Sequence, residues 1–148
     1  EMLRSLVGSE MCIRDRIHGS FGLQLADYIS QLFSYISNGA HKKLNIDEKF
    51  QVTVDDDRKL LQPQQLSAGT VDQIYFSVRM AVSQMLYDEP MPLILDDSFV
   101  LYDDERLKNT LRWLTEQKAF SQTLIFTCHH REAEMLESLN CDYHYVEL

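Results

Sequence analysis

Apolar residues between Phe21 and Ser37 recur at steps of three and four positions, the spacing that places them on one face of an α-helix. The pattern stops at Asn38 and Gly39. Glycine tolerates the left-handed backbone conformation that is needed just past the last turn of a helix. This stretch therefore predicts one amphipathic helix over residues 21–37.

A short β element is expected next in the chain. The segment Lys43–Val54 is expected to be extended, because apolar and polar residues alternate with a period of two towards its end. The three aspartates at positions 55–57 predict a turn, and Lys59–Leu61 is expected to return as a second strand. Pro63 ends this region.

The second half of the chain alternates helical and strand patterns, which is typical of an α/β fold with a mostly parallel sheet. Ser67 is placed to cap a helix that is apolar nearly all round and is therefore expected to be buried. The two strands that follow are continuous apolar runs, the pattern of parallel strands covered on both faces. Helices are expected over residues 71–86, 104–116 and 131–138, and strands over residues 93–95, 123–127 and 143–146.

The composition of the chain excludes some functions, whereas it says little about the fold. The chain has 148 residues, of which 45% are apolar, enough for the core of one domain or of part of one. Its net charge of −9 argues against an independent nucleic-acid surface, which needs basic residues over phosphates. Three widely spaced cysteines predict a reducing compartment, and no apolar run reaches the length of a membrane span. We therefore expect a cytoplasmic protein.

The first residues of the chain are a separate case. The segment from Ser5 to Arg16 is similar to a translated sequencing-adapter read, of the kind appended to open reading frames in sequence assemblies. We therefore expect residues 1–20 to be a non-native or disordered leader, and residues 21–148 to form the folded unit.

The turn within Leu66–Gln73 is the first candidate for chemistry. A helix N-terminus carries unpaired N–H groups and a partial positive charge, and small residues there let the backbone approach a phosphate closely. Ser67 and Gly69 are therefore candidate anion-binding residues. A serine and a glycine at the start of a helix are equally compatible with a simple N-cap.

Two consecutive carboxylates, Asp96 and Asp97, end the apolar strand that follows. Ligands in open parallel sheets bind beyond the carboxyl ends of the strands, where one carboxylate can hold Mg²⁺ while its neighbour orients an attacking water. The same pair can also cap the turn after a strand. Asp103 and His129 come later, and Asp103 also fits the N-cap of the next helix.

Taken in this order and spacing, the four motifs resemble the C-terminal half of an ABC-type ATPase head. The likeness is closest to the SMC-like heads of coiled-coil ATPases in chromosome maintenance and DNA repair. Leu66–Gln73 resembles the signature motif, and Leu93–Asp97 resembles Walker B. The resemblance implies a P-loop NTPase fold in which residues 21–148 form the C-terminal lobe of the head, entered by the last helix of a coiled coil.

The resemblance also implies roles for single residues. Ser67 and Gly69 would contact the γ-phosphate of the ATP held by the partner head, and Gln73 would support their turn. Asp96 matches the magnesium-associated aspartate. Asp97 stands where most ABC ATPases carry a glutamate as catalytic base, and its side chain is one methylene shorter.

Two further residues match family motifs. Asp103, seven residues after Asp96, matches the D-loop aspartate that crosses the dimer interface. His129 resembles the switch histidine that contacts the γ-phosphate in its own head, since the Thr-x-His step from Thr127 fits better than His130. The implied cofactors are ATP and Mg²⁺.

A Gly-x-x-x-x-Gly-Lys-Ser/Thr loop is absent from this sequence. Without that loop and its lysine the β- and γ-phosphates have no cradle, so we expect this polypeptide alone neither to bind ATP tightly nor to hydrolyse it. The expected partners are the missing N-terminal half of the head, a second head across ATP, and DNA through the full-length assembly. Strands left unpaired by the missing half would make the chain marginally stable or prone to aggregate.

Two other functions remain compatible with the sequence. A metal-dependent phosphoesterase would use Asp96, Asp97, Asp103 and His129 as a metal cluster, but it leaves the motif at Leu66–Gln73 without a role. A non-catalytic module that only dimerises would keep the fold of the head without ATP turnover.

Overall fold

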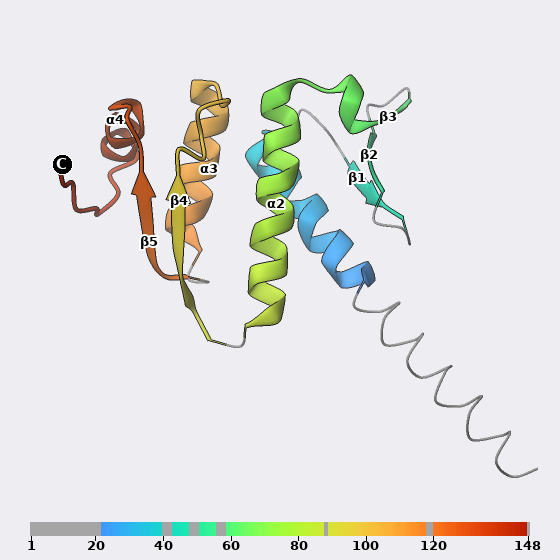
Figure 1. Cartoon of the computed structure of the whole chain (residues 1–148), viewed down its shortest axis with the longest axis horizontal. Coiled ribbons are helices and arrows are strands. Elements are labelled where there is room, and N and C mark those ends of the chain that lie inside the picture. Colours follow the sequence, from blue (N-terminus) through green and yellow to red (C-terminus); the bar gives the residue numbers. More distant parts are fainter. Residues whose placement is uncertain are drawn as a thin grey trace, which may run out of the picture.

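The computed structural model describes residues 22–39, 43–47, 51–55, 59–87, 89–117 and 120–147. The expected leader at residues 1–20 and most of the turn expected at residues 55–57 lie outside these ranges. The long helix α2 (Ala68–Leu86) lies between two parts of the molecule (Figure 1). One part contains a small antiparallel sheet, and the other contains a pair of parallel strands. Among the described helices, none combines the length and apolar character that a membrane crossing needs.

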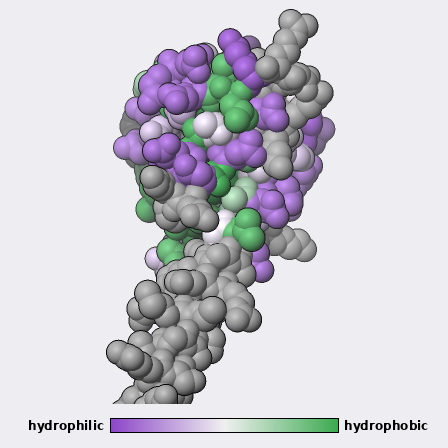
Figure 2. Space-filling view, turned by 90° about the vertical axis from the view of Figure 1, so that its right-hand side faces the viewer, coloured by the Kyte–Doolittle hydropathy of each residue, from purple (hydrophilic) through white to green (hydrophobic). Residues whose placement is uncertain are grey.

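The N-terminal helix covers residues 22–36, as expected, and packs on a small antiparallel sheet. That sheet has the order β1 (Lys43–Ile46), β2 (Val52–Asp55) and β3 (Leu60–Leu61). Figure 2 shows the molecule from the side on which this sheet lies in Figure 1. Polar and apolar residues are mixed over the described surface on this side.

The single extended segment expected over residues 43–54 is in fact a hairpin, so that prediction was wrong in detail. β1 and β2 pair with each other, and Leu44 lies opposite Val54. Asp47 makes the reversal possible, because its carboxylate accepts a hydrogen bond from the Gln51 N–H at 2.8 Å and its own N–H donates to the Gln51 carbonyl at 3.1 Å. The pairing buries Leu44 and Val54 against the N-terminal helix.

The central helix α2 (Ala68–Leu86) follows a short 3-10 turn, η1 (Pro63–Gln65). α2 begins three residues before the expected start because Ser67 caps it directly, with its Oγ accepting a hydrogen bond from the Thr70 N–H at 3.2 Å. Its buried residues face both halves of the molecule, so α2 joins the two cores.

The second half confirms the expected α/β arrangement. β4 (Met91–Asp96), α3 (Asp104–Glu116), β5 (Phe120–Phe126) and α4 (Arg131–Ser138) follow in order. β4 and β5 are parallel neighbours, with Leu95 opposite Ile125 and Asp96 opposite Phe126. Both strands start earlier than expected, whereas α3 and α4 have the expected bounds.

Only one face of the β4–β5 pair is covered, contrary to the expectation that both would be. Leu95 is 2% exposed and lies in the core, but its neighbour Ile94 is 63% exposed. Leu124 and Phe126, on the same face as Ile94, are also exposed, and Phe126 is 48% exposed. The described helices pack on the Leu95 face, and the apolar side chains of the other face meet none of them.

The last strand expected, over residues 143–146, does not form. A strand needs a neighbour for its backbone hydrogen bonds, and this segment instead turns back onto α4. The Tyr143 hydroxyl donates to the Ala133 carbonyl at 3.4 Å and contacts the Glu137 carboxylate at 3.1 Å. These contacts with α4 replace the strand ladder.

The core of the second half is built around Phe76 on α2. Its ring centroid lies 6.1 Å from that of Phe99, in the loop after β4, and 6.1 Å from that of Trp113 on α3. The leucine stripe expected on α3 also points into this core, which holds Leu107, Leu111 and Leu114. Phe76 therefore fixes the distance between α2 and the β4–α3 loop.

We predict that Phe76→Ala lowers the free energy of unfolding by about 3–5 kcal/mol, because it leaves a cavity beside the rings of Phe99 and Trp113. Tyr75→Ala is the matched control, since Tyr75 is exposed and its loss should change stability by less than about 0.5 kcal/mol. Urea denaturation followed by circular dichroism measures both. Equal effects of the two substitutions would contradict the assignment of Phe76 to the core.

Candidate functional site

One end of the second half collects nearly all the residues singled out from the sequence. The carboxyl ends of β4 and β5 and the N-termini of α2 and α3 all lie at this end (Figure 1). The residues there are Ser67, Gly69, Asp96, Asp97, Asp103 and His129. Carboxyl ends of parallel strands are the usual place for ligands in open α/β sheets.

Asp96 and Asp97 stand at the very end of β4, with both side chains exposed. The Asp97 N–H donates to the Phe126 carbonyl at 2.9 Å, which extends the strand pairing by one bond. Asp97 has a φ of 44°, in the left-handed region that non-glycine residues seldom adopt and aspartate tolerates better than most. Within the described residues, no side chain bonds to either carboxylate, so both can receive a cation or a water.

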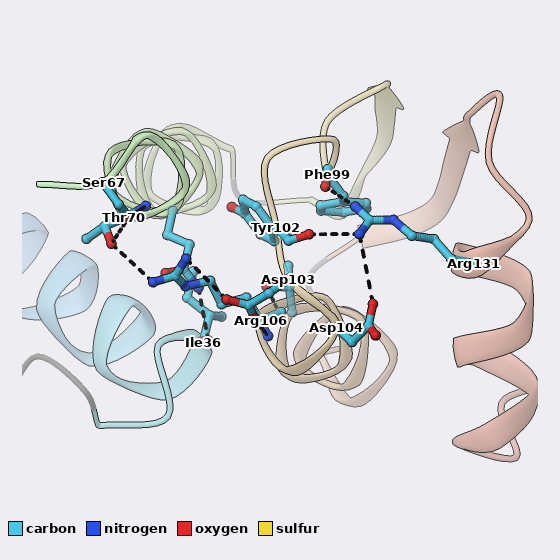
Figure 3. A network of polar contacts seen from close by, with 11 residues as sticks. Ile36, Ser67, Thr70, Phe99, Tyr102, Asp103, Asp104, Arg106 and Arg131 are labelled. Carbon is cyan, nitrogen blue, oxygen red and sulfur yellow. Dashed lines mark hydrogen bonds and ion pairs between the residues drawn. The ribbon is translucent and has the colours of Figure 1, made fainter.

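The serine of the predicted signature turn acts as the helix cap. The Ser67 hydroxyl lies 2.8 Å from the Thr70 hydroxyl and accepts the Thr70 N–H (Figure 3). Ser67 itself is exposed, at the positive end of the α2 dipole. The N-cap interpretation is confirmed, and it leaves the hydroxyl at the surface.

Gly69 is buried under the loop that precedes α3, a reason for glycine that the sequence did not reveal. A Cβ atom at this position would lie 2.5 Å from the Leu101 carbonyl oxygen and 3.0 Å from a guanidinium nitrogen of Arg106. No real Cβ approaches a backbone oxygen so closely. The absence of a side chain thus lets the start of α2 touch the β4–α3 loop.

Asp103 caps α3, as one of its two interpretations predicted. Its Oδ1 accepts the Arg106 N–H at 2.9 Å, and its Oδ2 lies 3.3 Å from Arg106 Nη1. Arg106 Nη2 also donates to the Thr70 hydroxyl at 3.3 Å (Figure 3). Arg106 was missed from the sequence, although its position three residues after the cap is where such a pair is expected.

His129 lies just beyond β5, with an exposed side chain. Its N–H donates to the Thr127 hydroxyl at 3.0 Å, and that hydroxyl donates to Glu132 Oε2 at 3.3 Å. Glu132 is 4% exposed, so a buried carboxylate fixes the backbone on which His129 stands. Thr127 was noted in the sequence only as the first residue of the Thr-x-His step, and Glu132 was not singled out.

Gln73 lies apart from the other residues. Its side chain is completely buried, and its Nε2 donates to the Ile36 carbonyl at 3.0 Å. The amide therefore bonds to the last turn of the N-terminal helix, and its role at the signature turn stays a prediction. A buried glutamine inside an apolar helix was the available signal for such a contact.

Tyr102 lies beneath this end of the molecule, and its buried hydroxyl has no hydrogen-bond partner among the residues that the structure describes. Burial, together with the charge of nearby Asp72, raises the pKa of the Tyr102 hydroxyl, so it stays protonated at neutral pH. Burial also raises the pKa of the Asp72 carboxyl, and the charge of Arg79 opposes that shift.

The phosphoesterase alternative finds little support in this geometry. Within the part of the chain that the structure describes, no three histidine, cysteine, aspartate or glutamate side chains come together as a metal-binding group. Asp96, Asp97, Asp103 and His129 share one end of the fold without forming a cluster. Asp96 and Asp97 are two exposed carboxylates at one strand end, and a phosphate-bound Mg²⁺ needs only one or two such ligands.

Sequence comparison finds one distant curated relative. No family model matches the chain. The chain is 29% identical over 119 residues to the uncharacterized protein YhaN of Bacillus subtilis (strain 168). The match covers 78% of this chain but only 12% of that protein, so the chain spans a small part of the length of its relative.

Comparison with solved structures identifies the fold of this chain. One solved chain, from work on ATP-driven dimerization and DNA-stimulated activation of SMC ATPases, matches with a TM-score of 0.66 and 16% identity, covering 82% of this chain and 76% of that one. The chain has the fold of an SMC ATPase head. This head fold is also seen in an Smc head bound to the C-terminal winged-helix domain of ScpA, with a TM-score of 0.61 at 15% identity.

A third structure is an Smc head with an extended coiled coil, bound to the C-terminal domain of ScpA from Pyrococcus furiosus, with a TM-score of 0.58 at 15% identity. The second and third matches each cover 76% of this chain, and they cover 36% and 30% of those chains. This chain therefore matches a part of each of these solved chains, and the likeness establishes its fold.

We predict that Gly69→Ala destabilises the chain by about 1–3 kcal/mol, because the added methyl group forces the β4–α3 loop away from α2. Gly22→Ala is the control, since a Cβ there would meet no atom within 4 Å. Urea denaturation gives the free energies, and amide shifts of Leu101 report the displacement of the loop. An unchanged Leu101 signal in Gly69→Ala would contradict the contact.

Proposed function

We propose that this chain is the C-terminal half of the head of an SMC-like coiled-coil ATPase, and that it acts in an ATP-bound dimer of two such heads. The observation that carries the proposal is the gathering of all four motif regions at the carboxyl end of β4 and β5 in an SMC-head fold. Motifs that are far apart in the sequence therefore meet at one end of the fold.

The residues divide into two groups by position. Ser67, Gly69 and Asp103 belong to the N-termini of α2 and α3, where N–H groups and helix dipoles favour the phosphates of a nucleotide on the partner head. Asp96, Asp97 and His129 belong to the strand ends, where they would serve the nucleotide of their own head. Asp96 would hold Mg²⁺, Asp97 would orient the attacking water, and His129 would donate a hydrogen bond to the terminal phosphate.

The proposed cofactors are ATP and Mg²⁺. Mg²⁺ would bind at the free carboxylates, and part of the ATP site would come from outside this chain. Mg²⁺ keeps several waters and needs few protein ligands, and the carboxylates of Asp96 and Asp97 are exposed and unpaired within the described residues. When bound, ATP with Mg²⁺ supplies the phosphoryl group whose hydrolysis would separate the two heads. The lysine-bearing phosphate loop, absent from this sequence, would have to come from the other half of the head.

The bare face of the β4–β5 pair is the surface that we assign to that other half. Ile94, Leu124 and Phe126 form an apolar stripe on two parallel strands whose opposite face is already buried. Parallel sheets are ordinarily covered on both sides, so this stripe matches an additional layer of the same head. Exposure of such a face also fits a chain that is marginally stable on its own.

The biological process of the parent protein is proposed from the solved structures that share its fold. The work that produced the first matching structure concerns ATP-driven dimerization and DNA-stimulated activation, and two other matching heads are bound to ScpA. We therefore assign the parent protein to DNA repair or chromosome maintenance, with DNA contacted by the full-length assembly. The described cysteines, Cys128 and Cys141, are free thiols, which fits the cytoplasm.

In the head reconstituted with its phosphate-loop half, Asp97→Asn is expected to lower ATP turnover by about 10²-fold or more while ATP binding is kept, because the amide cannot act as a base. Asp142→Asn removes one carboxylate at an exposed position away from the site and serves as the control. Phosphate release and nucleotide binding are measured in parallel. Unchanged turnover in Asp97→Asn would favour a module that dimerises without catalysis through this residue.

The double substitution Ile94→Thr with Phe126→Thr places β-branched threonines, which favour strands, at both positions but removes most of the apolar stripe. We expect it to weaken association with the phosphate-loop half at least about tenfold and to reduce aggregation of the chain alone. Tyr145→Thr, at another exposed position, is the control. Light scattering and titration of one half with the other measure the two effects, and undiminished association would show that the other half binds elsewhere.

A further inference from the structure

Two arginines hold the loop between β4 and α3, residues 97–103, from opposite sides (Figure 3). We propose that Arg131 and Arg106 are positioning residues that couple the segment carrying His129 to the turn carrying Ser67. The coupling is a property of this chain, and its meaning for ATP hydrolysis rests on the function proposed above.

Arg131 holds the loop from the side of α4. Its Nη1 donates to the Tyr102 carbonyl at 2.8 Å, and its Nη2 donates to the Phe99 carbonyl. The Tyr102 N–H also bonds to the Phe99 carbonyl at 2.9 Å, so the two acceptors belong to one tight turn. A planar guanidinium can bridge two carbonyls in this way, whereas a lysine ammonium is a single point charge.

Arg131 is in turn linked to the backbone of His129. Arg131 Nε lies 3.4 Å from Oε1 of the buried Glu132, and Oε2 of Glu132 accepts the Thr127 hydroxyl at 3.3 Å. The Thr127 hydroxyl accepts the N–H of His129 at 3.0 Å. Glu132 is 4% exposed, so displacing Arg131 would leave the buried charge of this carboxylate uncompensated.

Arg106 holds the same loop from the side of α2. It pairs with Asp103 at 3.3 Å and donates to the Thr70 hydroxyl at 3.3 Å, and that hydroxyl lies 2.8 Å from the hydroxyl of Ser67. The carbonyl of Leu101 presses on the buried Gly69. The start of α2 therefore follows the position of the loop.

The loop between the two arginines is anchored in the core by two of its own side chains. Phe99 and Tyr102 are buried, and their rings pack with centroids 5.5 Å apart. A shift of the His129 segment would move Arg131, the Phe99–Tyr102 turn and Asp103 together, and with them the Ser67 turn. In a dimer of heads, this chain of contacts runs from the nucleotide side of one head to the surface that meets the other, and coupling of this kind acts equally in both directions.

Contiguous contacts do not by themselves demonstrate coupling, so the test is energetic. Hydrogen exchange of the 148-residue chain is measured for Arg131→Gln, without nucleotide. We expect roughly tenfold faster exchange at the Tyr102 amide, since a charge-assisted hydrogen bond is lost, and also at the Thr70 amide, which bonds to Ser67. The exchange rates of the β2 amides should be unchanged, which would show that the substitution does not destabilise the whole chain.

Arg112→Gln, which removes the same charge near the far end of α3, is the matched control and should leave both amides as in the unaltered chain. Arg131→Lys should give intermediate exchange, because it keeps the charge without the bridge. Faster exchange at Tyr102 alone, with Thr70 unaffected, would overturn the proposal, since Arg131 would then have only a local structural role.

In the reconstituted head, Arg106→Gln and Arg131→Gln are each expected to lower kcat about tenfold with little change in KM for ATP, and the double variant should lose little more than either one. Additive losses would contradict a shared path. A reconstituted head that never hydrolyses ATP would instead refute the proposed function, while the exchange of Thr70 in the chain alone would still decide the coupling.

Discussion

The parallel pairing of β4 with β5 is the constraint from which the geometry of the site follows. Because the two strands run in the same direction and Asp96 lies opposite Phe126, the residues that follow each strand emerge at one edge. The helices that alternate with parallel strands must run back, so the N-terminus of α3 returns to the same edge. α2 packs antiparallel to the strands through Phe76, which brings Ser67 to the same end. The parallel pairing of two strands thus brings together motifs that are far apart in the sequence.

The loop between β4 and α3 turns this collection into a connected structure. Its carbonyl groups are bound by Arg131, its last residue Asp103 is bound by Arg106, and its backbone fills the space that Gly69 leaves open. Each contact alone is modest, since hydrogen bonds to charged groups contribute about 1.5–3 kcal/mol. Together they leave the loop few alternative positions, so the acidic strand end and the capped helix keep a fixed relation.

Much of this fold could be read from the sequence where the signal was local. α3 has the expected bounds because its Asp103 cap and its leucine stripe are short-range features. α4 also has the expected bounds, although no side chain caps its N-terminus. The β1–β2 hairpin, the absent strand at residues 143–146 and the bare face of β4–β5 depend on which segments meet, and periodicity does not report that. The contacts of Arg131 with the β4–α3 loop were missed because their acceptors are backbone carbonyls, which carry no mark in the sequence. Gly69 was noticed, but for phosphate binding and not for its contact with Leu101.

The central claim is that Ser67 and Asp96 face two different nucleotides in a pair of heads. The most direct measurement is a structure of the reconstituted head with Mg²⁺ and a non-hydrolysable ATP analogue. Our account predicts two heads, with Ser67 of one within hydrogen-bonding distance of the terminal phosphate bound at Asp96 of the other. A nucleotide bound away from the carboxyl ends of β4 and β5, or contacted by Ser67 and Asp96 of the same head, would contradict it.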